Sequence, residues 1–250
     1  MPPVRKITIL LLVLLTSIGT VTLFAQAEIK TDNKPPMITD NLAVATFAGG
    51  CFWCTESGFE KLRGVTMAIS GYTGGQEKEP HYRQVASGAT GHLESVRVYY
   101  DPMSITYQDL LQAFWRMINP TDSGGQFHDR GHQYSSAIFY HTEEQRKLAE
   151  SSIAELDSSH RYDKAIVTPI LMAGPFYPAE DYHQDYYKHN PLRYNLYRWN
   201  SGRDRYLKKV WGDDLIISHN MKQGHYHQPF PHFHPVKDGA LPCYISNVVF

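Results

Sequence analysis

Gly49-Gly50-Cys51-Phe52-Trp53-Cys54 joins a strand-like run at residues 43–48 to a helix-like run at residues 52–62. The two glycines allow the backbone to turn sharply as it leaves the strand. The helix is expected to end at Gly64. Cys51 is then placed at a helix N-terminus, where free N–H groups and the helix dipole favour an anion. We therefore expect the pKa of its thiol to be lowered.

The residues beside Cys51 indicate what this thiol could act on. Phe52 and Trp53 provide apolar walls, which suit a small uncharged substrate that carries sulfur or a methyl group. Cys54 lies one turn further on the same face, within reach of a disulfide, and Cys-x-x-Cys at a helix start is typical of a redox-active pair. A buried structural pair of cysteines is the alternative. The position directly after two glycines favours the reactive thiol.

The N-terminus predicts export. Residues 1–27 resemble a secretory signal, with a basic start, an apolar run at residues 7–15 and the cleavage pattern Ala25-Gln26-Ala27. An uncleaved anchor is the alternative, because residues 7–24 approach spanning length. Residues 28–41 predict a flexible leader. We expect a periplasmic or other extracytoplasmic protein with no stable membrane association after cleavage.

The composition excludes some functions. The chain has 250 residues, a formal net charge of −1 and no basic stripe, so no nucleic-acid partner is expected. We expect a monomer. Export places the three cysteines in an oxidising compartment, where an odd number cannot all pair within one chain.

Strand-like and helix-like runs alternate along the rest of the chain. Strands are expected at residues 65–72, 93–100, 136–140 and 166–173, and helices at residues 82–87, 106–118, 179–189 and 203–210. A further helix opens on Thr142 and buries Ala149, Ile153 and Leu156. This order predicts an α+β fold, a two-layer α/β sandwich with a single mixed sheet of the ferredoxin-like kind, in a catalytic domain at residues 42–212. The long loop at residues 119–133 is expected to be functional.

The strand at residues 93–100 contains an acidic side chain on an apolar face. Its alternation puts Glu94 on the same side as Val96 and Val98. Burial there raises the pKa of a carboxyl group, and a neutral carboxylic acid beside a thiol can donate a proton at neutral pH. The alternative is an ordinary Glu at a strand end, which reaches solvent or binds a loop.

Eight segments together resemble the A-type peptide methionine sulfoxide reductase family. They follow one another in order across residues 46–211. They are Gly49-Gly50-Cys51-Phe52-Trp53, Gly71-Tyr72-Thr73-Gly74-Gly75, Gly91-His92-Leu93-Glu94, Tyr99-Tyr100-Asp101-Pro102, Asp129 with Gly131, Gln133-Tyr134, Tyr140-His141-Thr142-Glu143-Glu144-Gln145, and Phe176-Tyr177-Pro178-Ala179-Glu180-Asp181-Tyr182-His183-Gln184. Their joint order is specific, although each segment alone is weak.

The resemblance implies a peptide-methionine (S)-S-oxide reductase that acts on methionine sulfoxide in proteins and in free form. Cys51 would attack the sulfoxide sulfur, and Glu94 would protonate the departing oxygen, to which the Tyr82 and Tyr134 hydroxyls would bind. Asp129 would support the site, and Phe52 and Trp53 would form the pocket for the S-methyl group. The resulting sulfenic acid would be converted to a disulfide and recycled by a thioredoxin-like reductant. No cofactor or metal is implied.

The sequence departs from the family at two positions. Many members have Gly where this chain has Cys54, so the second thiol is either Cys54 or Cys243 in the tail. Cys54 is favoured because it is local. Members commonly have Arg after the Gln-Tyr pair, where this chain has Ser135. The latter change affects a salt bridge and not the chemistry.

Two other functions stay open. One is a thiol–disulfide oxidoreductase using Cys51 and Cys54, which is disfavoured because that class usually places Trp before the first Cys. The other is a metal-binding export protein. The tail, residues 213–250, is rich in His and Pro, and it holds two His-x-His pairs that could bind Zn or Cu or be incidental: His225, His227, His232 and His234.

Overall fold

A computed structural model describes residues 41–215, which form a mixed sheet with helices packed against it. The predicted signal segment, nearly all of the leader and most of the tail lie outside the described residues. The strands run in the order β7-β6-β1-β3-β2-β8, antiparallel except for the parallel pair β6 and β7. Their bounds are β1 (Ala43–Gly49), β2 (Val65–Thr73), β3 (Leu93–Tyr100), β6 (Ser136–Tyr140), β7 (Ile170–Met172) and β8 (Tyr177–Pro178). The α+β class is confirmed.

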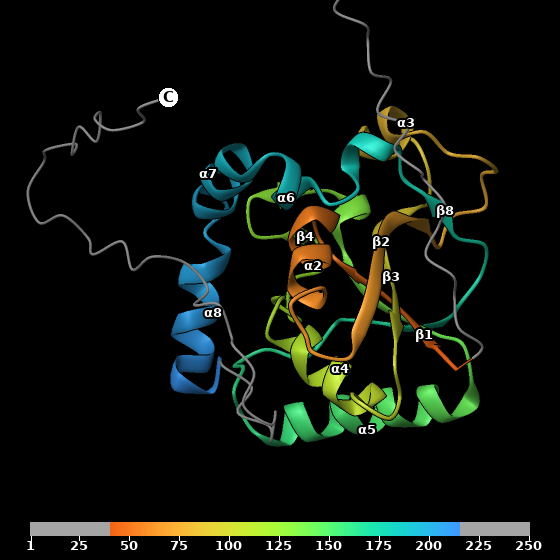
Figure 1. Cartoon of the computed structure of the whole chain (residues 1–250). Coiled ribbons are helices and arrows are strands. Elements are labelled where there is room, and N and C mark those ends of the chain that lie inside the picture. Colours follow the sequence, from red (N-terminus) through yellow and green to blue (C-terminus); the bar gives the residue numbers. More distant parts are fainter. Residues whose placement is uncertain (1–40, 216–250) are drawn as a thin grey trace, which may run out of the picture. The chain divides into compact units, whose positions relative to one another are not determined.

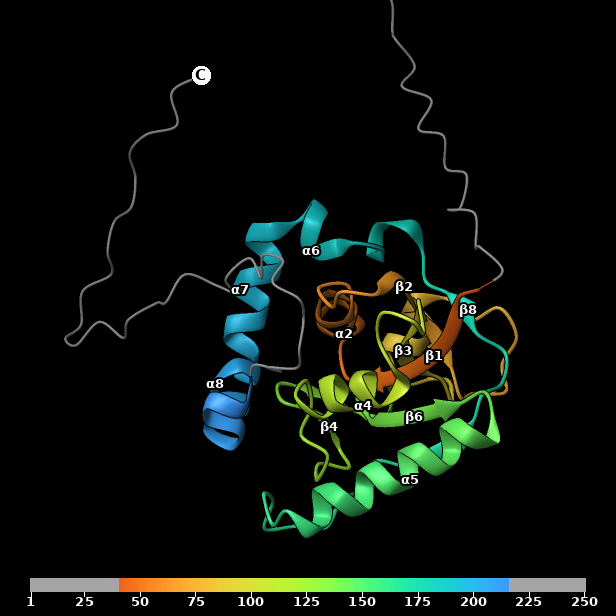
Figure 2. The ribbon, with the colours of Figure 1, turned by 60° about the horizontal axis from the view of Figure 1, so that its bottom comes forward.

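Helices pack against this sheet and against one another. They are α2 (Phe52–Phe59), α3 (Tyr82–Ala86), α4 (Tyr107–Trp115), α5 (Glu143–Ser158), α6 (Tyr186–His189), α7 (Pro191–Ser201) and α8 (Arg203–Trp211), with short 3-10 turns η1 (His132–Tyr134), η2 (Asp181–His183) and η3 (Gly212–Leu215). Helix α2 contacts β2 and β3, and α4 contacts β1 and α5. Figures 1 and 2 show α6 next to α2, with α7 and α8 continuing from it. None of the helices among residues 41–215 has the length and apolarity needed to cross a bilayer.

Aromatic stacking joins the elements that carry the Cys51 turn. The Phe47 ring of β1 stacks on Phe59 of α2 at 4.9 Å and on Phe114 of α4 at 5.0 Å between centroids. All three side chains are fully buried. Burial of each such ring contributes roughly 1.5–3 kcal/mol, so the last residue of α2 is held against β1.

Gly50 makes the turn from β1 into α2 possible. Its φ of 80° lies in the left-handed region, and a Cβ there would lie 2.5 Å from the Cβ of Gln126. Any side chain would therefore clash as well as strain the backbone. The helix ends at Phe59, three residues earlier than predicted, and the chain turns before Gly64, whose φ is 97°.

The predicted single sheet is wrong in one respect. Within the long loop, β4 (Gly125–Gln126) and β5 (Asp129–Arg130) form a separate two-stranded sheet. The Gln126 side-chain amide bridges the loop, because it accepts from the N–H of Asn119 at 2.8 Å and donates to its carbonyl at 2.9 Å. These bonds close the loop over seven residues, and the sequence analysis did not predict the small sheet that follows.

Two other element predictions need correction. The strand expected at residues 166–173 covers only Ile170–Met172, since Pro169 has no N–H to give to a ladder. The helix expected at residues 179–189 is broken, because Asp185 takes a φ of 52° between η2 and α6. Helix α7 was not predicted. The two-layer and ferredoxin-like descriptions stay predictions.

Candidate active site

The two cysteines of the first α2 turn are buried free thiols. Cys51 is the N-cap residue and is 6% exposed, whereas Cys54 is 1% exposed. The N–H of Cys54 donates to the Cys51 carbonyl at 3.1 Å, which starts the helix. The sequence therefore places Cys51 correctly at a helix N-terminus.

Glu94 lies directly against this turn. Its Oε2 accepts a hydrogen bond from the N–H of Phe52 at 3.0 Å, and the residue is 2% exposed. The prediction that Glu94 shares the buried face of β3 with Val96 and Val98 is confirmed. Burial raises the pKa of Glu94 to about 8, against the opposing bond from Phe52, and the nearby charge of Asp129 also raises it. The carboxyl group thus holds its proton at neutral pH.

The ionisation expected for Cys51 is wrong. Burial raises the pKa of the Cys51 thiol well above its ordinary value, and its hydrogen bond to Cys54 and the nearby carboxyl groups Glu94 and Asp129 raise it further. The same hydrogen bond lowers the pKa of Cys54 to about 6, with help from the positive charge of Arg203. Of the two thiols, Cys51 therefore has the raised pKa and Cys54 the lowered one.

Two tyrosines from separate elements face this pair. Tyr82 opens α3 and Tyr134 ends η1, and the Tyr82 ring lies 6.4 Å from that of Phe52. Burial, together with the neighbouring Glu94 and Cys51, raises the pKa of Tyr82 to about 12. Burial and the charge of Glu94 also raise the pKa of Tyr134. Both hydroxyls therefore stay protonated and can donate hydrogen bonds.

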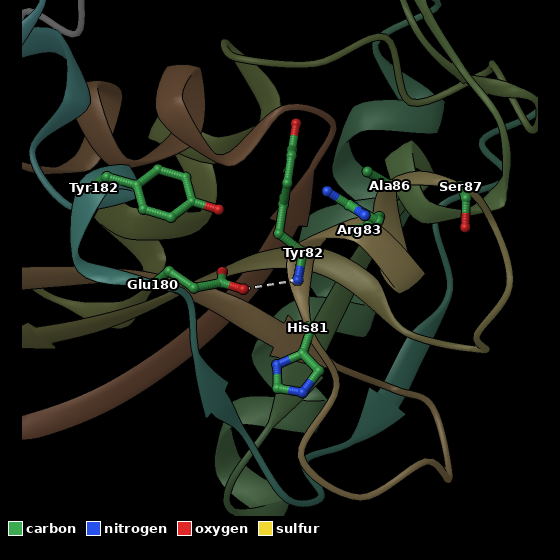
Figure 3. Close-up of a pocket in the computed structure, with 7 residues that line it drawn as sticks. All are labelled: His81, Tyr82, Arg83, Ala86, Ser87, Glu180 and Tyr182. Carbon is green, nitrogen blue, oxygen red and sulfur yellow. Dashed lines mark hydrogen bonds between the residues drawn. The ribbon is translucent and has the colours of Figure 1, made fainter.

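Glu180 fixes the position of Tyr82. Its Oε1 accepts from the N–H of Tyr82 at 2.9 Å (Figure 3), and its Oε2 accepts from the Tyr72 hydroxyl at 2.8 Å. Burial opposes ionisation of Glu180, but the bonds from Tyr82 and Tyr72 keep its pKa below the ordinary value. Glu180 lies within the family-like segment at residues 176–184, but the sequence analysis assigns it no role.

Asp129 reaches the site from the β4–β5 hairpin. One of its carboxylate oxygens accepts a short hydrogen bond from the Tyr197 hydroxyl of α7. Its negative charge raises the pKa values of both Cys51 and Glu94. The structure therefore brings Asp129 within electrostatic range of Cys51 and Glu94.

Aromatic rings form the wall next to the thiol. Phe52 is buried against His183, with ring centroids 5.0 Å apart, and Trp53 stacks on Tyr186 at 3.7 Å. The indole N–H of Trp53 donates to His183 Nδ1 at 3.0 Å. Burial lowers the pKa of His183 to about 4, so the imidazole stays neutral and can accept this bond.

A hollow of about 710 Å³ shares Tyr82 with the site. It is open to solvent and does not include Cys51 or Glu94. Figure 3 shows the side chains that line it. Its lining residues are His81, Tyr82, Arg83, Ala86, Ser87, Glu180 and Tyr182.

Sequence reasoning missed four residues at the site: Glu180, His183, Tyr197 and Arg203. The helix that carries Tyr197 had a readable signal, because Asn190-Pro191 and Gly202 flank it, and Pro is common at the first helical position and Gly just after the last. Cys243 and the four tail histidines lie outside the described residues. Among residues 41–215, no three His, Cys, Asp or Glu side chains are grouped so as to hold a metal ion.

Comparisons with known proteins agree with this arrangement. The model of the peptide methionine sulfoxide reductase family matches residues 43–215. The peptide methionine sulfoxide reductase MsrA of Bacillus licheniformis is 53% identical over 169 residues, 68% of this chain and 93% of that protein. The MsrA/MsrB protein of Vibrio cholerae is 50% identical over 198 residues, 78% of this chain, which spans only 51% of that protein. The structure of methionine sulfoxide reductase A of Corynebacterium diphtheriae aligns with a TM-score of 0.55 and 31% identity, covering 62% of this chain and 77% of that one. This chain belongs to the peptide methionine sulfoxide reductase family.

Proposed function

We propose that this chain is a peptide-methionine (S)-S-oxide reductase that converts methionine sulfoxide, in proteins and in free form, to methionine. One observation carries the proposal. The protonated carboxyl of Glu94 and the buried thiol of Cys51 meet at the first turn of α2, joined through the N–H of Phe52 at 3.0 Å. Sulfoxide reduction requires a thiol nucleophile beside an acid that is protonated at neutral pH.

In the first step Cys51 gives its proton to the Cys54 thiolate and attacks the sulfoxide sulfur. The hydrogen bond between the two thiols supports this transfer, since Cys54 has a pKa of about 6. Glu94 donates its proton to the departing oxygen. The hydroxyl group formed in this way passes from the substrate sulfur to the Cys51 sulfur, and the bond between the two sulfurs breaks. Methionine leaves, and Cys51 becomes a sulfenic acid.

In the second step Cys54 attacks the sulfur of the sulfenic acid. A disulfide forms between Cys51 and Cys54, and the hydroxyl leaves as water with the proton that Cys54 had taken. A thioredoxin-like dithiol then reduces this disulfide. The position of both thiols in one turn of α2 supports Cys54 over Cys243.

The substrate would lie against the aromatic wall. We assign the S-methyl pocket to Phe52 and Trp53, and the hydrogen bonds to the sulfoxide oxygen to the Tyr82 and Tyr134 hydroxyls. The polypeptide around the methionine sulfoxide would enter the hollow that Tyr82 lines, because this hollow is open to solvent beside the site.

Several finer assignments are part of the same proposal. The N-terminal sequence supports export to the periplasm with cleavage after residue 27, and we propose a monomer that acts in protein repair during oxidative stress. The order β6-β1-β3-β2 of the four central antiparallel strands supports a ferredoxin-like core in two layers.

The test is turnover of a methionine sulfoxide peptide with dithiothreitol. Cys51→Ser should abolish methionine production, because serine cannot act as the sulfur nucleophile. Cys54→Ser is the matched control, since dithiothreitol can reduce the sulfenic acid directly, and it should keep part of the turnover. Undiminished turnover by Cys51→Ser would contradict the proposal. Rapid reduction of insulin disulfides with little sulfoxide reduction would favour a thiol–disulfide oxidoreductase instead.

A further inference from the structure

Arg203, the first residue of α8, is a buried cation next to the cysteine turn. It is 1% exposed, and its Nη2 donates to the Gly49 carbonyl at 3.1 Å. Its Nη1 donates to the Met117 carbonyl, and the guanidinium lies 4.6 Å from the Phe127 ring centroid. Its Nε is buried without a hydrogen-bond partner. Carbonyls and a ring thus surround this charge.

No carboxylate of the described residues forms an ion pair with Arg203. The neighbouring Arg198 shows the contrast, because Asp204 Oδ1 binds its Nη2 at 2.7 Å and its Nε at 3.0 Å. A buried charge is unfavourable unless an anion compensates it. Since no carboxylate pairs with Arg203, we looked for its compensating anion among the other ionisable side chains nearby.

Cys54 is the group that fits. Arg203 lies under the turn that leads into α2, since a Cβ on Gly50 would be 3.1 Å from its Nη2. Cys54 belongs to the first turn of that helix and is 1% exposed. Of the positive charges that lower the pKa of Cys54, Arg203 acts most strongly, ahead of Arg198.

The other ionisable groups around Cys54 do not replace Arg203. Asp129 opposes the thiolate, and Glu94 holds its proton. Tyr194 and Tyr197 have raised pKa values, chiefly through burial, and stay neutral. Burial lowers the pKa of Lys61, which also interacts with Cys54.

We propose that Arg203 is the counter-cation of a Cys54 thiolate and makes Cys54 the sulfur that leaves when a dithiol reductant opens the Cys51–Cys54 disulfide. Arg203 is thus a positioning residue for the recycling half of the reaction. The disulfide step rests on the proposed function, but the ion pair in the reduced chain does not.

The reduction proceeds in two exchanges. A thiolate of the reductant attacks Sγ of Cys51, which is the more exposed of the two cysteine residues. A mixed disulfide forms with Cys51, the Cys51–Cys54 bond breaks, and its electron pair stays on Cys54 beside Arg203. The second thiolate of the reductant then attacks the first reductant sulfur, which is bonded to Cys51 in the mixed disulfide. Cys51 is released and takes a proton from solvent. The reductant ends as a disulfide.

The ion pair is tested by titrating Cys54 alone. In the full-length chain with Cys51→Ser and Cys243→Ser, the ultraviolet absorbance of the thiolate reports Cys54. Arg203→Met should raise the titration midpoint by about 1 to 3 pH units, as loss of a close opposite charge does. Arg203→Lys, which keeps the charge, should restore a lower midpoint. The exposed Arg205 of the same helix gives the matched control Arg205→Met, which should leave the midpoint unchanged.

An equal midpoint in folded Arg203→Met and Arg205→Met would overturn the ion pair.

A second measurement needs no change at Arg203. The full chain completes one turnover without reductant, meets a thioredoxin whose second active-site cysteine is serine, and is quenched with iodoacetamide. Peptide mapping should find thioredoxin on Cys51 and the alkyl group on Cys54, and the reverse would overturn the leaving-group assignment. A Cys51–Cys243 disulfide would instead contradict the resolving thiol of the proposed function, while the titration still decides the ion pair.

Discussion

Two buried carboxyl groups near helix α2 share a pKa of about 8 but lie in different surroundings. Glu94 accepts the N–H of Phe52 at 3.0 Å, where α2 begins. Glu56, within α2 itself, is fully buried and accepts the N–H of Asp185 at 3.2 Å. In both cases burial is the largest cause of the raised pKa, and one backbone donor opposes it.

Their neighbours separate the two groups. Glu94 faces the Cys51 thiol and the Tyr82 hydroxyl. Glu56 faces the segment that begins α6, where Lys188 binds Glu60 at 2.7 Å. A raised pKa therefore measures burial, and the groups within reach of the proton decide whether it serves catalysis. We interpret Glu94 as the acid and Glu56 as a structural link between α2 and α6.

The largest expected difference is in turnover. Glu94→Gln should lower kcat/KM by about 10²- to 10⁴-fold, the usual contribution of a general acid. Its amide oxygen can still accept the N–H of Phe52, so the fold should persist. Glu56→Gln removes the same kind of group and should leave kcat/KM nearly unchanged. Equal losses in steady-state assays with a methionine sulfoxide peptide would erase the distinction between the two sites.

The pH profile sharpens the same comparison. Turnover should fall above pH 8, because Glu94 has a pKa of about 8 and loses the proton it must donate. It should also fall below pH 6, where Cys54 takes up a proton and can no longer accept one from Cys51. Glu56→Gln should keep this bell shape, and Glu94→Gln should lose the upper limb. If Glu56→Gln removed the fall in turnover above pH 8 instead, this fall would be due to Glu56 and not to Glu94.

Two tyrosines give a smaller contrast. Tyr82→Phe removes a donor to the sulfoxide oxygen and should lower kcat/KM about 10-fold, the loss of one hydrogen bond of roughly 1.4 kcal/mol. Tyr187 donates its hydroxyl to Glu60 at 2.7 Å in the other region, so Tyr187→Phe should leave kcat/KM unchanged. Parallel assays on peptide and free methionine sulfoxide measure both variants. Loss of activity in Tyr187→Phe alone would place the reaction near Glu60.

The sequence predicts one of these regions better than the other. Alternation along β3 was enough to put Glu94 on a buried face, and the glycine pair was enough to put Cys51 at a helix start. Glu56 gave no comparable signal, because its partner Asp185 lies 129 residues away on an unpredicted turn.

The ionisation of the cysteines shows where local reasoning ends. A helix N-terminus is visible in the sequence and predicted a Cys51 thiolate. Burial raises the pKa of Cys51, and the hydrogen bond between the two thiols lowers that of Cys54, with a smaller contribution from Arg203. Arg203 lies 154 residues from the Gly49 carbonyl to which it donates, so local patterns do not show it. The burial of Cys51 depends on the packing of distant segments, which the sequence around the helix start does not show.

The smallest effect concerns stability. The pKa of Glu56 is about 8 in the folded chain against an ordinary value of 4.5, so the folded state binds the proton more tightly. The stabilisation of the folded state by Glu56 is therefore complete below pH 4.5 and is lost as the pH rises through 8. Glu56→Gln, which cannot ionise, should lower the pH slope of the unfolding free energy by up to about 1 kcal/mol per pH unit between those values. Urea unfolding at pH 5, 6.5 and 8 measures this slope, with the exposed Glu144→Gln as control. A slope that is the same in both variants would mean that Glu56 titrates alike in the folded and unfolded chain, and that its burial beside α6 does not hold the proton.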